Sequence, residues 1–234
     1  MLRVNSRDTS LGIVSSLNLL SDAGTADADA AGERNKILRA AHETFIQNSF
    51  DLFTDCPTRE RAGWLCDSFF LGRAEKLYTG KNLIEKNFLE NYLLLDNYEN
   101  IPDGMIPMCY PADVDSGGFI PNWAMWFILE LKDYSYRTGD SAFISLFRYK
   151  VYRLIGWFER FENADGLLER LPGWVFIEWS KANDFVQDIN FPSNMLYSAA
   201  LSAAGELFAD ENLKQKAEKL REIIRERSFD GKFF

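Results

Sequence analysis

The stretch PSNMLYSAALSAAGELFADENLKQKAEKLREIIRERS, residues 192–228, decides the fold class. Its second half is amphipathic, because apolar residues recur every three to four positions and so lie on one face of a helix. These residues are Leu213, Ala217, Leu220 and Ile224. We predict one helix over residues 192–210 and another over residues 211–228, paired as an antiparallel hairpin.

Upstream segments extend this pattern. Five more helices are predicted over residues 33–50, about 58–79, 82–98, 119–140 and 141–161. Two long irregular stretches, residues 99–118 and 164–184, interrupt them, and loops of such length are usually functional or disordered. Helix pairs with almost no strand signal predict an all-α fold of concentric antiparallel hairpins rather than a four-helix bundle.

Residues 1–32 have a different composition from the rest of the chain. They are rich in Ser, Ala, Asp and Gly and end in SDAGTADADAAG, with weak periodicity. Such a segment predicts a poorly ordered leader or linker. The globular part is therefore expected to begin at Glu33 and to span residues 33–234.

The composition excludes several classes of function. Lys and Arg total 26 against 35 Asp and Glu, and the net charge of −9 disfavours nucleic acid and anionic membranes as partners. One histidine, His42, leaves little room for a His-rich metal site or a His-dependent nucleophile. No run approaches the roughly 18 apolar residues of a membrane span, and no convincing signal peptide is present. The function classes that remain are catalysis by carboxylate side chains and a role without catalysis.

The cysteine and aromatic residues and a possible metal motif narrow the classes of function further. The three cysteines, Cys56, Cys66 and Cys109, form no CxxC pair, and we interpret all three as small buried residues. Asp113 and Asp115 resemble part of a calcium loop without its other ligands, so no metal or cofactor is expected. Aromatic residues make up 15% of the chain, and most must be core, although flat rings also bind sugar faces.

The segment DCPTRERAGWLCDS, residues 55–68, carries the strongest chemical signal. If a helix begins near Pro57, Glu60, Trp64 and Asp67 follow i, i+4, i+7 and share one face. A carboxyl held near other carboxylates and an indole should have a raised pKa, as a general acid requires. The alternative is structural: the acids cap the helix, the arginines pair with them, and Trp64 is core.

The same residues resemble the signature of the α-L-rhamnosidase family of glycoside hydrolases, commonly DCPxRxERxGWxxD. The PDGMIP segment, a tryptophan helix ending at Gly139–Asp140 and a Trp174…Glu178–Trp179 loop agree in order. The resemblance covers roughly residues 33–234. It implies a catalytic domain built as an (α/α)6 toroid of six helical hairpins, of which this chain would be the N-terminal portion.

The resemblance also implies roles. It implies inverting hydrolysis of terminal α-L-rhamnose, with Glu60 as the general acid. Asp55 and Asp67 would line the rhamnose subsite, and Arg59 and Trp64 would bind hydroxyls and pack against the ring. Three further residues are expected to contact substrate, in one concave site shared with the 101–123 loop: Trp123, Glu178 and Trp179.

The sequence departs from the family pattern at several points. The motif is one residue shorter before Glu60, Met125 stands where an acid is common, and Glu178–Trp179 replaces Asp–Trp. The family's general base is a glutamate in the last hairpins, which would lie beyond residue 234. The expected partners are therefore a carbohydrate substrate, the rest of the catalytic domain and accessory β-sandwich domains.

Two hypotheses follow from these observations. One is a rhamnoside hydrolase domain; the other is a helical-toroid relative that binds carbohydrate or scaffolds another domain without catalysis. The sequence leaves open the aglycone, the linkage, the oligomeric state, and whether the protein is cytoplasmic or secreted.

Overall fold

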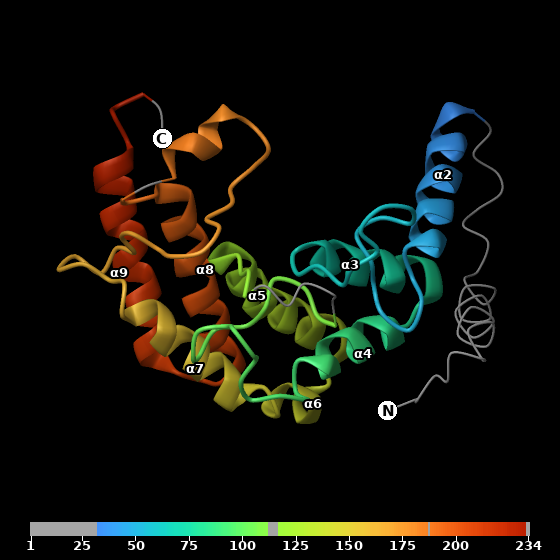
Figure 1. Cartoon of the computed structure of the whole chain (residues 1–234), viewed down its shortest axis with the longest axis horizontal. Coiled ribbons are helices and arrows are strands. Elements are labelled where there is room, and N and C mark those ends of the chain that lie inside the picture. Colours follow the sequence, from blue (N-terminus) through green and yellow to red (C-terminus); the bar gives the residue numbers. More distant parts are fainter. Residues whose placement is uncertain (1–31, 112–116, 187, 233–234) are drawn as a thin grey trace. The chain divides into compact units, whose positions relative to one another are not determined.

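The computed structural model describes residues 32–111, 117–186 and 188–232 (Figure 1). Over these ranges the chain forms eight α-helices and one 3₁₀ helix, and pairs strand-like residues only in four isolated bridges. The predicted all-α class is confirmed. The predictions for residues 1–31 and for Asp113 and Asp115 lie outside the described residues.

The chain divides into two compact units. The described part of unit 1 comprises residues 32–94 and 109–111, with helices α2 (Glu33–Gln47), α3 (Asp67–Thr79) and α4 (Leu83–Asn91). Unit 2 comprises the other described residues. Its helices are α5 (Pro121–Thr138), α6 (Ser141–Ser145), α7 (Arg148–Glu159), the 3₁₀ helix η1 (Lys181–Phe185), α8 (Phe191–Leu207) and α9 (Glu211–Ser228).

Helices α8 and α9 form the hairpin that the sequence predicts, and they lie side by side (Figure 1). The turn between them ends at Asp210, whose carboxylate accepts the backbone N–H groups of Asn212 and Leu213 and so caps α9. Close packing at this corner requires a glycine. A Cβ at Gly205 would lie 2.7 Å from the Lys214 side chain and 2.9 Å from the Asp210 carbonyl oxygen.

Helix α5 packs on α8 and is buried on most of its circumference, as its nearly all-round apolar sequence predicts. It begins at Pro121, where the missing N–H of proline costs nothing, and ends at Gly139, which adopts the left-handed conformation with φ 69°. A buried hydrogen bond of 2.9 Å from Asn122 to Ser193 joins the first turns of α5 and α8.

Unit 1 has a core of aromatic rings. Successive ring centroids along the series Phe45, Phe53, Phe88, Tyr92 and Tyr110 lie 5.7–6.3 Å apart in tilted contacts. These rings fill the space around the α3–α4 pair, which is joined at Gly80, the predicted stop. Part of the aromatic excess is therefore structural, as expected.

Two predicted helices are shorter or broken. The helix predicted over residues 82–98 ends at Asn91, and the carbonyl oxygens of Leu95 and Asp96 accept hydrogen bonds from Lys150 and Arg153 instead of from a following helical turn. The helix predicted over residues 141–161 is split into α6 and α7, and the Phe147 ring at the break is fully buried against Phe143. Tertiary contacts override local propensity at both places.

None of the helices in the described part of the chain is long and apolar enough to cross a membrane.

Candidate active site

The chemical motif folds as a closed loop rather than as a helix. Asp55 donates its backbone N–H to the Ala62 carbonyl oxygen at 3.2 Å, and the Asp55 carboxylate accepts the Ala62 N–H at 3.1 Å. Helix α3 begins only at Asp67. The prediction that a helix starts near Pro57, with Glu60 and Trp64 on one helical face, is therefore wrong.

Contacts with a distant segment explain why the helix starts late. The Tyr110 N–H donates to the Gly63 carbonyl oxygen at 3.2 Å, and Trp64 pairs with Cys109 in an isolated antiparallel bridge. A Cβ at Gly63 would meet the Tyr110 carbonyl oxygen at 3.0 Å, so a glycine allows this close approach. Backbone groups committed to this bridge cannot join a helix.

Three carboxyl groups of the motif nevertheless share one neighbourhood. Burial raises the pKa of Asp67 to about 6, and the nearby charges of Asp55 and Glu60 raise it further against a backbone hydrogen bond that lowers it. Burial also raises the pKa of the Cys109 thiol to about 12, again with contributions from Asp55 and Glu60. The raised carboxyl pKa expected of this motif is thus found at Asp67.

Glu60 is the accessible member of this group. Its side chain is 40% exposed and forms a 2.8 Å ion pair with Arg59, which is 79% exposed. A pair this exposed contributes little to stability and leaves both groups open to a bound molecule. Trp64 as a whole residue is half-buried, and its indole Nε1 is buried.

Trp123 and Trp179 belong to an aromatic cluster in unit 2. The Phe176 ring lies 5.8 Å from Trp123 and 4.9 Å from Trp179, and Trp174 lies 5.6 Å from Trp179, all edge to face. Trp179 is 83% exposed and Trp174 is 41% exposed. The cluster therefore exposes the indoles of Trp174 and Trp179 to solvent, and the half-buried Phe176 ring lies beneath them.

Hydrogen bonds between the Asn183 side chain and the backbone help to fix the loop that carries the cluster. Asn183 accepts the Ile177 N–H at 2.8 Å and donates to the Val175 carbonyl oxygen at 3.4 Å, while the Trp174 N–H donates to Phe119 at 3.0 Å. Glu178 is exposed on this loop and accepts a hydrogen bond from Ser180. Sequence reasoning missed Phe176 and Asn183, although the W-V-F-x-x-W spacing was a signal for the first.

Five predicted site residues thus lie in unit 1, namely Asp55, Arg59, Glu60, Trp64 and Asp67, and three lie in unit 2, namely Trp123, Glu178 and Trp179. In unit 1 Asp55, Glu60 and Asp67 lie close enough to affect one another's charge, and Arg59 pairs with Glu60. In unit 2 Trp123 and Trp179 both contact Phe176. That both groups form one concave site stays a prediction. Among the described residues, no cluster of three or more His, Cys, Asp or Glu side chains could hold a metal ion.

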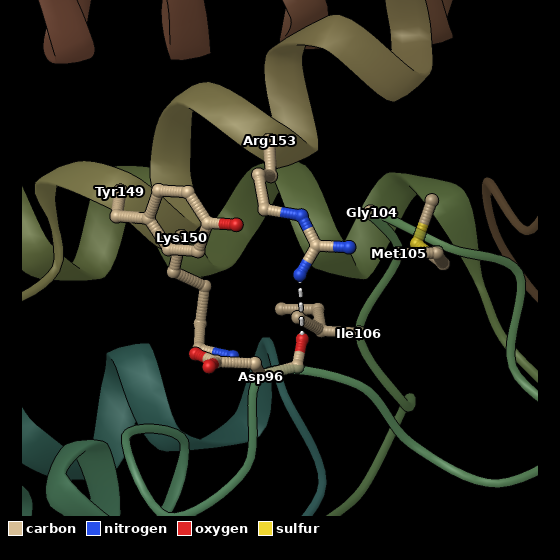
Figure 2. Close-up of a pocket in the computed structure, with 7 residues that line it drawn as sticks. All are labelled: Asp96, Gly104, Met105, Ile106, Tyr149, Lys150 and Arg153. Atoms are coloured by element: carbon tan, nitrogen blue, oxygen red, sulfur yellow. Dashed lines mark hydrogen bonds between the residues drawn. The ribbon is translucent and has the colours of Figure 1, made fainter.

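Unit 2 contains a small cavity beside the hydrogen bonds that hold the 95–104 segment against α7. Figure 2 shows Arg153 directed at Asp96, whose carbonyl oxygen it binds at 2.9 Å, beside Lys150, which binds the Leu95 carbonyl oxygen at 2.7 Å. Burial lowers the pKa of Lys150 to about 8. The cavity measures about 10 Å³, roughly the room that one water molecule needs. These contacts fasten the 95–104 segment to α7, and no predicted site residue lines the cavity.

Comparisons with known proteins agree on one family. The profile of the bacterial α-L-rhamnosidase six-hairpin glycosidase domain matches residues 30–227. A rhamnosidase from Klebsiella oxytoca, solved with rhamnose bound, superposes with a TM-score of 0.68 at 18% identity over 90% of this chain. A GH78 family rhamnosidase of Bacillus sp. GL1 superposes with a TM-score of 0.62 at 22% identity over 81% of it.

The match spans 40% of the Klebsiella chain and 20% of the Bacillus chain. At these identities the superpositions establish the fold. No curated protein matches the sequence.

Proposed function

The chain belongs to the bacterial α-L-rhamnosidase six-hairpin glycosidase family, and we propose that it carries the general-acid side of an inverting α-L-rhamnosidase site. In this proposal Glu60 protonates the glycosidic oxygen of a terminal α-L-rhamnoside, and Asp55 and Asp67 hold the sugar hydroxyls. Arg59 and Trp64 complete this side of the subsite.

The observation that carries the proposal is the proximity of three acids of the motif, of which Asp55 and Glu60 lie in the loop and Asp67 begins α3. Burial raises the pKa of Asp67 to about 6, and the nearby charges of Asp55 and Glu60 raise it further, so the Asp67 carboxyl retains a proton in mildly acidic solution. A glycosidase acid must hold a proton beside anionic neighbours. Glu60 is accessible at 40% exposure, and the half-buried Asp67 is better placed to accept hydrogen bonds from the substrate.

The aromatic cluster of unit 2 supports a carbohydrate ligand. A pyranose ring has an apolar C–H face that packs on an indole. Trp179 is 83% exposed on a loop that is held by the Asn183 side chain, which accepts the Ile177 N–H. We propose that Trp179 and Trp123 contact the sugar and that Glu178 accepts a hydrogen bond from a sugar hydroxyl. Phe176 would act by holding both tryptophan rings.

Inversion requires a second carboxylate about 6.5–9.5 Å from the acid, with a water molecule between them. We place this general base outside residues 1–234, in the later hairpins of the toroid. The share of the solved rhamnosidases that this chain spans supports that placement.

Glu60→Gln tests the role of Glu60. In the intact protein that contains this chain, the variant should lower kcat on an unactivated rhamnoside by about 10²–10⁴-fold, because the poor leaving group loses its proton donor. On an aryl rhamnoside with an acidic phenol as leaving group, the loss should be far smaller. Steady-state kinetics on both substrates measure the difference.

Glu43→Gln, an exposed change on α2, is the matched control and should leave both rates unchanged. Equal losses on the two substrates in Glu60→Gln would remove the acid role from Glu60. Binding of L-rhamnose with no turnover of either substrate by the unaltered protein would instead establish the non-catalytic carbohydrate-binding alternative.

A further inference from the structure

The backbone of Glu60 is held by a sulfur atom. Its N–H donates to the Cys56 thiol sulfur at a donor–acceptor distance of 3.2 Å. In an α-helix the N–H of residue 60 would donate to the carbonyl oxygen of residue 56. The motif loop keeps this four-residue spacing and replaces the carbonyl oxygen with a side chain.

This contact lies inside the ring closed by Asp55 and Ala62. Arg61, the next residue after Glu60, adopts a left-handed conformation with φ 53°, which an arginine rarely does. The backbone of Glu60 is therefore bonded at its own N–H and is followed directly by a residue in the left-handed conformation. Among the described residues, the Glu60 side chain forms one ion pair, with Arg59, and that pair is exposed. The hydrogen bond to Cys56 therefore adds to the positioning of Glu60 from the backbone side.

Position matters for an acid catalyst because a displacement of about 1 Å can cost about 10²-fold in rate. We propose that Cys56 is a positioning residue for Glu60, and that its thiol fixes the main chain from which the acid reaches the glycosidic oxygen. This inference rests on the proposed function of Glu60, whereas the contact itself does not.

Two variants separate the contact from the bulk of the side chain. Cys56→Ala removes the acceptor, and Cys56→Ser keeps one with a shorter reach. Thr58→Ala is the matched control, because Thr58 is an exposed residue of the same loop. Circular dichroism and urea unfolding establish that each variant is folded before it is compared.

Amide hydrogen exchange by NMR on the 234-residue chain tests the contact without any substrate. The Glu60 N–H should exchange at least several-fold faster in Cys56→Ala than in the unaltered chain or in Thr58→Ala, with Cys56→Ser between them. An unchanged exchange rate in Cys56→Ala would show that the thiol does not hold this amide, and would overturn the inference.

Kinetics on the intact protein test the consequence. Cys56→Ala should lower kcat on an unactivated rhamnoside about 10-fold to 100-fold, lower it only a few-fold on an activated aryl rhamnoside, and recover partly in Cys56→Ser. A merely structural defect would lower both rates alike, and that result would contradict the positioning role. If Glu60→Gln shows the leaving-group effect and Cys56→Ala does not, this inference alone fails; if neither shows it, the proposed function fails.

Discussion

Glu75 is a buried carboxyl group that the sequence did not single out. It is 1% exposed, and its two oxygens accept the Ile84 and Glu85 backbone N–H groups at 2.9 Å each, so it caps α4 from the neighbouring helix α3. Glu85 is fully buried beside it and accepts a hydrogen bond from Asn82. Burial raises the pKa of Glu75 to about 7, with Glu85 adding to the effect and the backbone hydrogen bonds opposing it.

This group should make the stability of the chain depend on pH. Its folded pKa lies above its unfolded value of 4.5, so its stabilising contribution is complete below pH 4.5 and is lost as pH rises through 7. The loss is on the order of 3 kcal/mol. Urea unfolding between pH 5 and pH 8 should therefore show falling stability, and Glu75→Gln should flatten that slope.

Glu90→Gln, an exposed change on α4, should keep the slope of the unaltered chain. A slope that survives in Glu75→Gln would assign the pH dependence to another group, of which Asp67 is the first to examine.

Helix boundaries in unit 2 depend on buried polar residues. Asn194, fully buried in the first turn of α8, accepts the Leu168 N–H at 2.7 Å and donates to the carbonyl oxygens of Leu168 and Asn190. It thus fastens the loop before η1 to α8 and satisfies both backbone groups of Leu168.

Asn194→Ala should destabilise the chain by about 2–4 kcal/mol, because the buried N–H and carbonyl of Leu168 lose their partners. The midpoint of urea unfolding measures this change. Gln215→Ala, an exposed amide on α9, should shift the midpoint little. A comparably small shift in Asn194→Ala would show that water replaces the lost hydrogen bonds.

Most helices could be predicted from the sequence, because periodicity and end signals agree for them. Helix α9 has the predicted bounds, 211–228, and Gly80 and Gly139 end their helices as expected. Prediction failed where distant residues decide the local structure. The bridge between Trp64 and Cys109 keeps residues 57–66 out of a helix, and nothing in the local pattern reports that pairing.

The proximity of the motif acids was predictable from the sequence, and the geometry of the loop that holds them was not. Asp55, Glu60 and Asp67 lie close to one another in the structure, as expected for acids so close together in the sequence. A loop with a hydrogen bond to the Cys56 thiol holds Glu60, and the acids do not share one helical face as predicted. The Phe176 floor and the Asn183 contacts could not be foreseen, since they depend on how a long loop folds back on itself.

At the scale of the whole molecule, the hairpins fit a known architecture. The α8–α9 and α3–α4 pairs, the all-α class and the family match over residues 30–227 agree with a six-hairpin glycosidase domain. Loops carry Asp55, Glu60 and the exposed indoles of Trp174 and Trp179, and Asp67 is the first residue of α3. Such a placement is usual where a rigid scaffold supports a site.

Hydrolysis of an aryl α-L-rhamnoside, compared between the intact protein and residues 1–234 alone, tests most directly whether this chain supplies the acid but not the base of a rhamnosidase. The intact protein should release the phenol with steady turnover. The isolated chain should release little or none, because we propose that the carboxylate that activates water on the opposite face of the sugar lies outside residues 1–234. Turnover by the isolated chain at the rate of the intact protein would contradict the proposal that the acid and the base lie in different parts of the protein. So would a lack of turnover by the intact protein.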